Sequence, residues 1–196
     1  MENKVCLKNL TEEELKEYIK SIGEKAFRAT QIYGWIYKGA KSFSDMKNIP
    51  KSLQEKLEEI AFIGNLNINL KLVSKLDGTR KYLFELNDGN IIESVMMEYE
   101  HGVTVCISNQ VGCRMGCRFC ASTIDGLVRN LEPWEILDQI IKIQEDIGKR
   151  VSNLVLMGSG EPLDNFDNTK QFLKLVNDKN GFSLSLHGLR NIFIIC

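Results

Sequence analysis

The sequence lacks the features that mark several specialised classes of protein. It has no run approaching the ~20 consecutive apolar residues of a membrane-spanning helix, and its charged beginning has no apolar stretch like that of a secretory signal. Three prolines in 196 residues exclude a proline-rich linker, and a hydrophobic content of 43% excludes intrinsic disorder. The sequence therefore predicts a globular cytoplasmic protein with no membrane partner.

Net charge is almost absent as well. The chain has 25 Lys and Arg against 26 Asp and Glu, which gives a formal net charge of −1. Total charge thus does not indicate a nucleic-acid partner, although a local basic patch could still hold one.

Residues 1–63 show the spacing of helices. Thr11 and Glu14 have the three-residue separation of a capping box, in which each side chain accepts from the other residue's backbone amide. Apolar stripes at helical spacing follow this box, recur over 28–38, and return from Pro50 onward. We predict a small all-helical N-terminal domain.

Residues 64–108 change to a two-residue period. Apolar side chains alternate with polar ones from Leu66 to Leu72, which predicts a half-buried strand. Two Asp-Gly turns then separate further apolar runs. We expect an antiparallel β extension, with its later strands near 80–86, 90–97 and 103–108.

From residue 109 onward, helical and strand patterns alternate. Helices are expected at 133–147 and 167–177, and strands at 154–157 and 191–195. The first of these strands is a continuous apolar run, typical of a parallel strand buried on both faces. The order predicts an α/β fold in 109–196, as an open parallel sheet or part of a (β/α) barrel.

Three cysteines lie close together in this last part. The spacing Cys113-x3-Cys117-x2-Cys120 supplies three thiolates from one segment. A four-iron cluster held by three cysteines keeps one iron open for a small molecule. The alternative is a structural zinc site, which needs four ligands and would recruit Cys106 or His101.

The cysteine spacing resembles the radical S-adenosylmethionine superfamily, and the flanking segments resemble one of its families, RlmN. The segments that carry this resemblance are FRATQIYGWIY (27–37), DGTRKY (77–82), IESV (92–95), CISNQVGC (106–113), CAST (120–123), GLVRNL (126–131) and MGSGEPLDN (157–165). The resemblance implies the first part of a radical-SAM barrel, preceded by a helical module that contributes to RNA binding.

The resemblance also implies roles for individual residues. Cys113, Cys117 and Cys120 would bind a [4Fe-4S] cluster, Gly160 and Glu161 would contact S-adenosylmethionine, Glu93 would accept a proton, and Cys106 would form a transient disulfide. From pattern alone, Glu93 is a solvent-facing strand residue and Cys106 a small buried hydrophobe. Gly160 and Glu161 follow an apolar strand, where parallel sheets bind ligands.

RlmN enzymes methylate carbon 2 of an adenine in 23S rRNA, and some also methylate adenine 37 of tRNA, through a methyl-cysteine intermediate. The resemblance therefore implies RNA substrates and an electron donor such as flavodoxin or ferredoxin. Two alternatives stay open: a carbon-8 adenine methyltransferase of the Cfr type, and a zinc-binding RNA module.

The chain departs from the family pattern at its end. It stops at Cys196, too early in family order for the methyl-carrying cysteine, and its tail lacks the family's Ser-Thr pair. We therefore expect a truncated member that assembles a cluster but does not complete methyl transfer alone.

Overall fold

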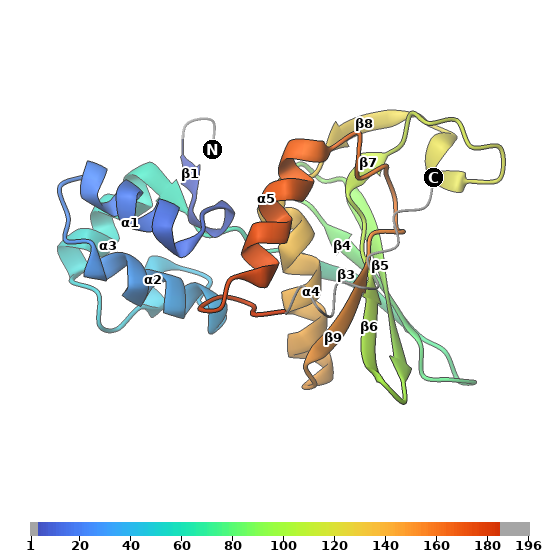
Figure 1. Cartoon of the computed structure of the whole chain (residues 1–196), viewed down its shortest axis with the longest axis horizontal. Coiled ribbons are helices and arrows are strands. Elements are labelled where there is room, and N and C mark those ends of the chain that lie inside the picture. Colours follow the sequence, from blue (N-terminus) through green and yellow to red (C-terminus); the bar gives the residue numbers. More distant parts are fainter. Residues whose placement is uncertain (1–3, 185–196) are drawn as a thin grey trace. The chain divides into compact units, whose positions relative to one another are not determined.

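The computed structural model describes residues 4–184, which divide into two compact units (Figure 1). The first unit comprises residues 4–65 and 173–184, and the second comprises 66–172. The strand predicted at 191–195 lies outside the described residues. Within 4–184, no helix has both the length and the apolar character needed to cross a membrane.

The first unit is built mainly of helices. They are α1 (Glu12–Ser21), α2 (Phe27–Tyr37) and α3 (Lys51–Ile60), with short 3-10 turns at Leu7–Asn9 and Phe43–Asp45. The sequence did not predict one addition, a two-residue parallel pairing of β1 (Val5–Cys6) with β2 (Ala61–Phe62).

The helices of this unit form where local signals predict them. The Thr11 hydroxyl accepts from the Glu14 amide at 3.3 Å, and Glu14 accepts from the Thr11 amide at 2.8 Å, which confirms the capping box. The helical stripes meet in one buried core, which includes Leu15, Ile19, Ile32, Ile36, Leu53 and Leu57. Burial of these stripes is the main source of helix stability here.

The second unit is organised around a five-stranded sheet. Its strands are β3 (Asn67–Val73), β4 (Arg80–Glu85), β5 (Ile91–Tyr99), β6 (Gly102–Cys106) and β9 (Val151–Val155), in that spatial order. The first four are antiparallel, and β9 joins β6 in parallel. The described residues form an open sheet, and the predicted α/β class is confirmed.

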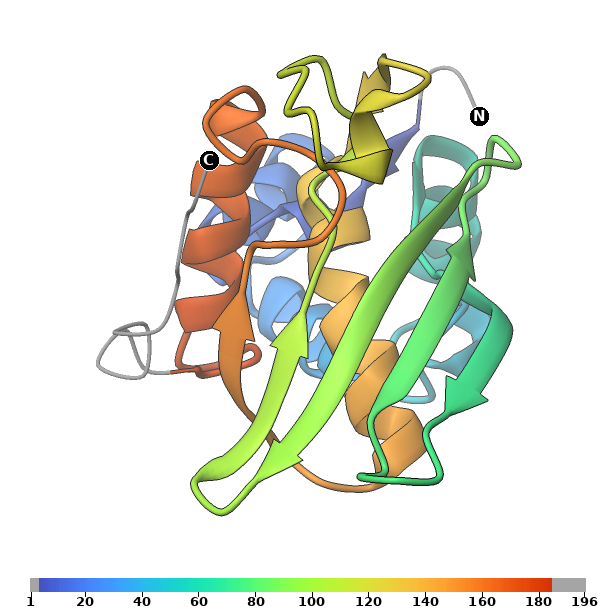
Figure 2. The ribbon, with the colours of Figure 1, turned by 90° about the vertical axis from the view of Figure 1, so that its right-hand side faces the viewer.

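Helix α4 (Pro133–Ile147) covers one face of this sheet (Figure 2). The Ser94 hydroxyl of β5 donates to Gln139 Oε1 at 2.6 Å, and the Tyr82 hydroxyl of β4 donates to Asp146 at 2.7 Å. Strand residues of the other parity, such as Glu93 and Cys106, lie on the opposite face.

Two predictions about burial are wrong. The side chains of β3 are exposed along its whole length, with Leu70 at 44% and Leu72 at 53%, so this strand is not half-buried. It is an edge strand, and these leucines are on the face away from α4, since Lys71 reaches α4 at Asp146. Strand β9 begins earlier than predicted and buries Val151 and Leu154 but not its other face.

Candidate cluster and cofactor site

The cysteine segment is a loop between two short strands. Strands β7 (Gln110–Gly112) and β8 (Leu127–Asn130) pair antiparallel, and the Cys113 amide donates to the Gly126 carbonyl at 3.0 Å at the base of the loop. Gly112 has a φ of +72°, and a side chain there would overlap the Gly126 carbonyl oxygen. Only glycine therefore allows this closed base.

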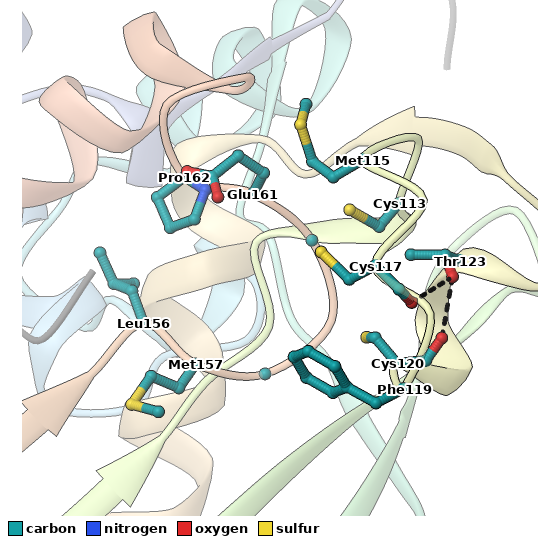
Figure 3. Close-up of a pocket in the computed structure, with 12 residues that line it drawn as sticks. Cys113, Met115, Cys117, Phe119, Cys120, Thr123, Leu156, Met157, Glu161 and Pro162 are labelled. Atoms are coloured by element: carbon teal, nitrogen blue, oxygen red, sulfur yellow. Dashed lines mark hydrogen bonds between the residues drawn. The ribbon is translucent and has the colours of Figure 1, made fainter. Parts of the chain in front are cut away.

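The three predicted cluster cysteines line one cavity of about 460 Å³. Cys113 is buried, while Cys117 and Cys120 are partly exposed. Figure 3 shows their sulfur atoms pointing from the loop toward the turn that carries Glu161 and Pro162. None of the three is in a disulfide. The volume is typical of small-molecule sites, which range over roughly 300–1,000 Å³.

The opposite wall of the cavity is the segment 158–164, here called the glycine turn, which follows β9. Gly158, Gly160, Glu161 and Pro162 line the cavity from this side. Gly160 has a φ of +105°, and a Cβ there would lie 2.6 Å from the Cβ of Gln110. The Glu161 side chain is buried and its Oε1 accepts from the Leu163 amide at 2.9 Å. The two predicted cofactor-binding residues thus face the cysteine loop across one cavity.

The donor set is three thiolates from one loop that line the same cavity, the number that leaves one iron of a four-iron cluster open. Among the described residues, no group of three or more His, Cys, Asp or Glu side chains is close enough to hold one metal ion. In a four-iron cluster each thiolate binds a different iron, so the sulfurs stand further apart than around one zinc. Neither Cys106 nor His101, one of which the zinc hypothesis needs as fourth ligand, lines the cavity of the three cysteines.

Glu93 lies on β5, on the sheet face away from α4, and is not among the residues that line the cavity. Its carboxylate is about half exposed and pairs with Lys81 of β4 at 2.5 Å. As expected from its pattern, it is accessible to solvent.

Cys106 shares this face with Glu93. It lies opposite Val95 of β5, and Val95 is two residues along that strand from Glu93. Cys106 is partly exposed. Burial and the nearby Glu93 carboxylate raise the pKa of the Cys106 thiol, although a hydrogen bond with the Met157 backbone opposes the rise. Cys106 is not in a disulfide, so the transient disulfide implied by the family has no support in this state. The two predicted catalytic side chains are therefore neighbours on one sheet face, and Cys106 lies opposite Val155 at the end of β9, the strand that leads into the glycine turn.

Three polar residues connect the two walls of the cavity, namely Gln110, Arg114 and Asp164, and the sequence did not indicate that they contact one another. Gln110 is fully buried, and its side chain makes two hydrogen bonds to the glycine turn. Gln110 and Asp164 lie inside segments that resemble RlmN, and Arg114 directly follows one, but the resemblance gives no role to any of the three.

Comparison with known proteins follows the same division of the chain. The family model for the ribosomal RNA large subunit methyltransferase N-terminal domain matches residues 5–63, and the radical SAM superfamily model matches residues 107–195. These two matches agree with the resemblance found in the sequence.

Named relatives extend the similarity over almost the whole chain. A probable dual-specificity RNA methyltransferase RlmN from Clostridioides difficile is 71% identical over 96% of this chain and 54% of that protein. Another from Alkaliphilus oremlandii is 56% identical over 92% of this chain and 53% of that protein. A crystal structure of a radical SAM methyltransferase from Sphaerobacter thermophilus superposes with a TM-score of 0.83 at 34% identity, covering 92% of this chain and 54% of that one. The chain spans about half the length of the relatives it matches.

Proposed function

Because the chain belongs to the RlmN family of radical S-adenosylmethionine RNA methyltransferases, we propose that its protein methylates carbon 2 of one adenine in 23S rRNA. Adenine 37 of tRNA is the second proposed substrate, and a methyl-cysteine is the proposed intermediate. The proposal includes a flavodoxin-type or ferredoxin-type electron donor and action in the cytoplasm, where these RNAs are found.

One observation supports the proposal most strongly: the cysteine loop and the glycine turn form two walls of a single cavity. A cluster on Cys113, Cys117 and Cys120 would present its open iron to a ligand held by the turn. When bound, this cluster supplies the one-electron reduction that cleaves the carbon–sulfur bond of S-adenosylmethionine.

The glycine turn has the properties needed to hold that cofactor. Gly160 lines the cavity, and because it has no side chain the turn can lie directly against Gln110, where an added Cβ would clash. The Glu161 carboxylate can accept from the ammonium group of the methionine part, and such charge-assisted bonds are stronger than neutral ones. We assign cofactor binding to Gly160 and Glu161 on this basis.

Glu93 and Cys106 are proposed as the two side chains that complete the reaction on the RNA. Glu93 would take the proton from the ring carbon, since a carboxylate at hydrogen-bond distance from its target can act as a general base. The Cys106 thiolate would then attack the methyl-cysteine sulfur: an S–S bond forms as the bond from that sulfur to the transferred carbon breaks, and the carbon keeps the electron pair and takes up a proton to become the methyl group. The nucleophile is the thiolate, and burial raises the pKa of the Cys106 thiol, so the site must favour loss of this proton during the reaction.

A chimera gives the test of the methyl position. This chain replaces the matching half of the C. difficile relative, which is 71% identical to it, and the chimera is incubated anaerobically with unmodified 23S rRNA, S-adenosylmethionine and a reductant. Mass spectrometry of the digested RNA should find 2-methyladenosine, and the Glu93→Gln and Cys113→Ser variants should give none. Formation of 8-methyladenosine instead would contradict the proposal and favour the Cfr-type alternative.

A further inference from the structure

An ion pair joins the cysteine loop to the glycine turn. Arg114, the residue after the first cluster cysteine, donates from Nε to Asp164 Oδ2 at 2.8 Å and from Nη2 to Asp164 Oδ1. The contact is bidentate, which fixes direction as well as distance. The Asp164 side chain is 14% exposed, whereas Arg114 is 61% exposed. The exposed Arg114 side chain of the cysteine loop thus binds the largely buried Asp164 side chain of the glycine turn.

The buried side chain of Gln110 also binds the glycine turn. Its Nε2 donates to Asp164 Oδ2 at 2.9 Å and to Asn130 Oδ1 at 2.7 Å, while its Oε1 accepts from the Glu161 amide at 2.9 Å. The side-chain amide of Gln110 therefore bonds to three places: the Glu161 backbone, the Asp164 carboxylate that also pairs with Arg114, and Asn130 of strand β8. Every polar atom of the Gln110 amide has a partner in this arrangement.

We propose that Gln110, Arg114 and Asp164 form a clasp that positions the cysteine loop against the glycine turn before any cofactor binds. The three residues are positioning residues, because they act on the orientation of Cys113–Cys120 and of Glu161. The consequence for the cofactor rests on the function proposed above. The cluster would bind the cysteine loop, and the cofactor that must contact it would bind the glycine turn. The clasp fixes the distance between these two segments. Preorganisation of this kind lowers the entropy lost on binding.

The first test uses the cofactor-free chain and amide hydrogen exchange in peptides covering residues 113–124. Arg114→Met removes the bidentate pair, and we expect amide exchange in these peptides to accelerate about fivefold. This estimate lies between the small effect of losing an exposed ion pair and the larger effect of losing a buried charged hydrogen bond. Arg114→Lys keeps the charge but not the fork and should give an intermediate rate. Arg118→Met removes an exposed arginine of the same loop and should stay within twofold of wild type.

A double-mutant cycle separates the clasp from general loosening. Asp164→Ala should accelerate exchange at least as much as Arg114→Met, and the double variant should match Asp164→Ala alone, since residues that share one contact are not additive. Wild-type exchange in Arg114→Met, equal acceleration by Arg118→Met, or a double variant equal to the product of the single effects would each overturn the proposal.

The second readout follows the cofactor. After anaerobic reconstitution, Arg114→Met should keep the iron content of wild type but raise the Kd for S-adenosylmethionine about fivefold, measured through the electron paramagnetic resonance signal of the reduced cluster. An unchanged Kd at equal iron content would show that the clasp does not position the cofactor. If wild type itself assembles no cluster, the proposed function fails while the exchange experiment still decides whether the clasp exists.

Discussion

At the scale of single residues, the chemistry of Cys106 depends on its neighbour Glu93. Burial is the larger cause of the raised thiol pKa, and the negative charge of Glu93 adds to it. Lys81 pairs with Glu93 and reduces this repulsion. The charged and titratable side chains that the described strands β3 to β6 place on this face are Lys81, Glu85, Glu93, Tyr99 and Cys106 itself.

Glu93→Gln should therefore lower the pKa of the Cys106 thiol, since it removes a charge that disfavours the thiolate. The measurement is the pH dependence of Cys106 alkylation by iodoacetamide, quantified on the Cys106 peptide by mass spectrometry. Glu85→Gln, which removes an exposed carboxylate of β4, is the control. Equal midpoints in Glu93→Gln and wild type would show that the two side chains are not coupled.

Gly160 is a position of the glycine turn where an added side chain would both clash with its surroundings and strain the backbone. Gly160→Ala would bring a Cβ to 2.6 Å from Gln110 Cβ at a φ of +105°, and we expect a loss of about 1–3 kcal/mol in the free energy of unfolding. Urea unfolding followed by Trp134 fluorescence in a Trp35→Phe background measures it in the second unit.

The matched control is Gly89→Ala, in the same unit. Gly89 also has a positive φ, +83°, but no atom lies within 4 Å of the position that an added Cβ would take. Its cost should therefore be smaller than that of Gly160→Ala, because only backbone strain remains. A larger loss for Gly89→Ala would refute the steric argument.

At the scale of secondary-structure elements, Gln139 joins α4 to the sheet. Its Oε1 accepts from the Ser94 hydroxyl and the Ser108 amide, and its Nε2 donates to the Ser108 carbonyl at 2.9 Å. All three residues are buried. Gln139 thus bonds Ser108 in the segment between β6 and β7, which leads into the cysteine loop, and it does so beside a second bond, from the Ser108 hydroxyl to the Glu93 carbonyl at 2.7 Å.

Gln139→Met should lower the free energy of unfolding by about 3 kcal/mol, because it leaves several buried polar groups without partners at roughly 1–3 kcal/mol each. Glu145→Gln, on an exposed part of the same helix, should stay within about 0.5 kcal/mol of wild type. Comparable urea midpoints for the two variants would contradict this account of the α4 contact.

Strand β8 is held by a second polar contact, at Arg129. Arg129 bonds Glu135 at the start of α4 and Asp88 in the turn between β4 and β5. Burial alone would raise the pKa of the Asp88 carboxyl, but the hydrogen bonds from Arg129 and Asn90 outweigh it and lower that pKa to about 2.

This lowered pKa predicts a specific acid dependence. The Asp88 contribution to stability is fully present above the unfolded-state pKa of about 4 and is lost as the pH falls through about 2. Asp88→Asn should therefore flatten the decline of the urea midpoint between pH 4 and pH 2. The same slope in variant and wild type would mean that the Arg129–Asp88 contact does not stabilise the folded state.

The elements differ in how far the sequence predicts them. The capping box at Thr11 and the stripe of Leu15 and Ile19 were predictable because both signals are local. The exposure of Leu72 was not, since the alternation in β3 does not say which side of the sheet is covered. Gln110 was not predictable either, because its partners Glu161 and Asp164 are 51 and 54 residues away in the chain.

At the scale of the whole molecule, the site belongs to one unit. All residues that line the cavity, together with Glu93 and Cys106, lie within 66–172. The described helices of residues 4–65 form a separate core and match the N-terminal domain of ribosomal RNA methyltransferases. We therefore expect cluster and cofactor binding to be properties of the second unit, and the helical unit to act on RNA.

The most direct test is anaerobic reconstitution of this chain with iron and sulfide, followed by electron paramagnetic resonance of the reduced protein with and without S-adenosylmethionine. We predict four iron and four sulfide per chain, as in a [4Fe-4S] cluster, and a signal that changes when the cofactor is added. The Cys113→Ser, Cys117→Ser and Cys120→Ser variants should each lose the cluster. A colourless protein with stoichiometric zinc, or a cluster signal that S-adenosylmethionine leaves unchanged, would contradict the account.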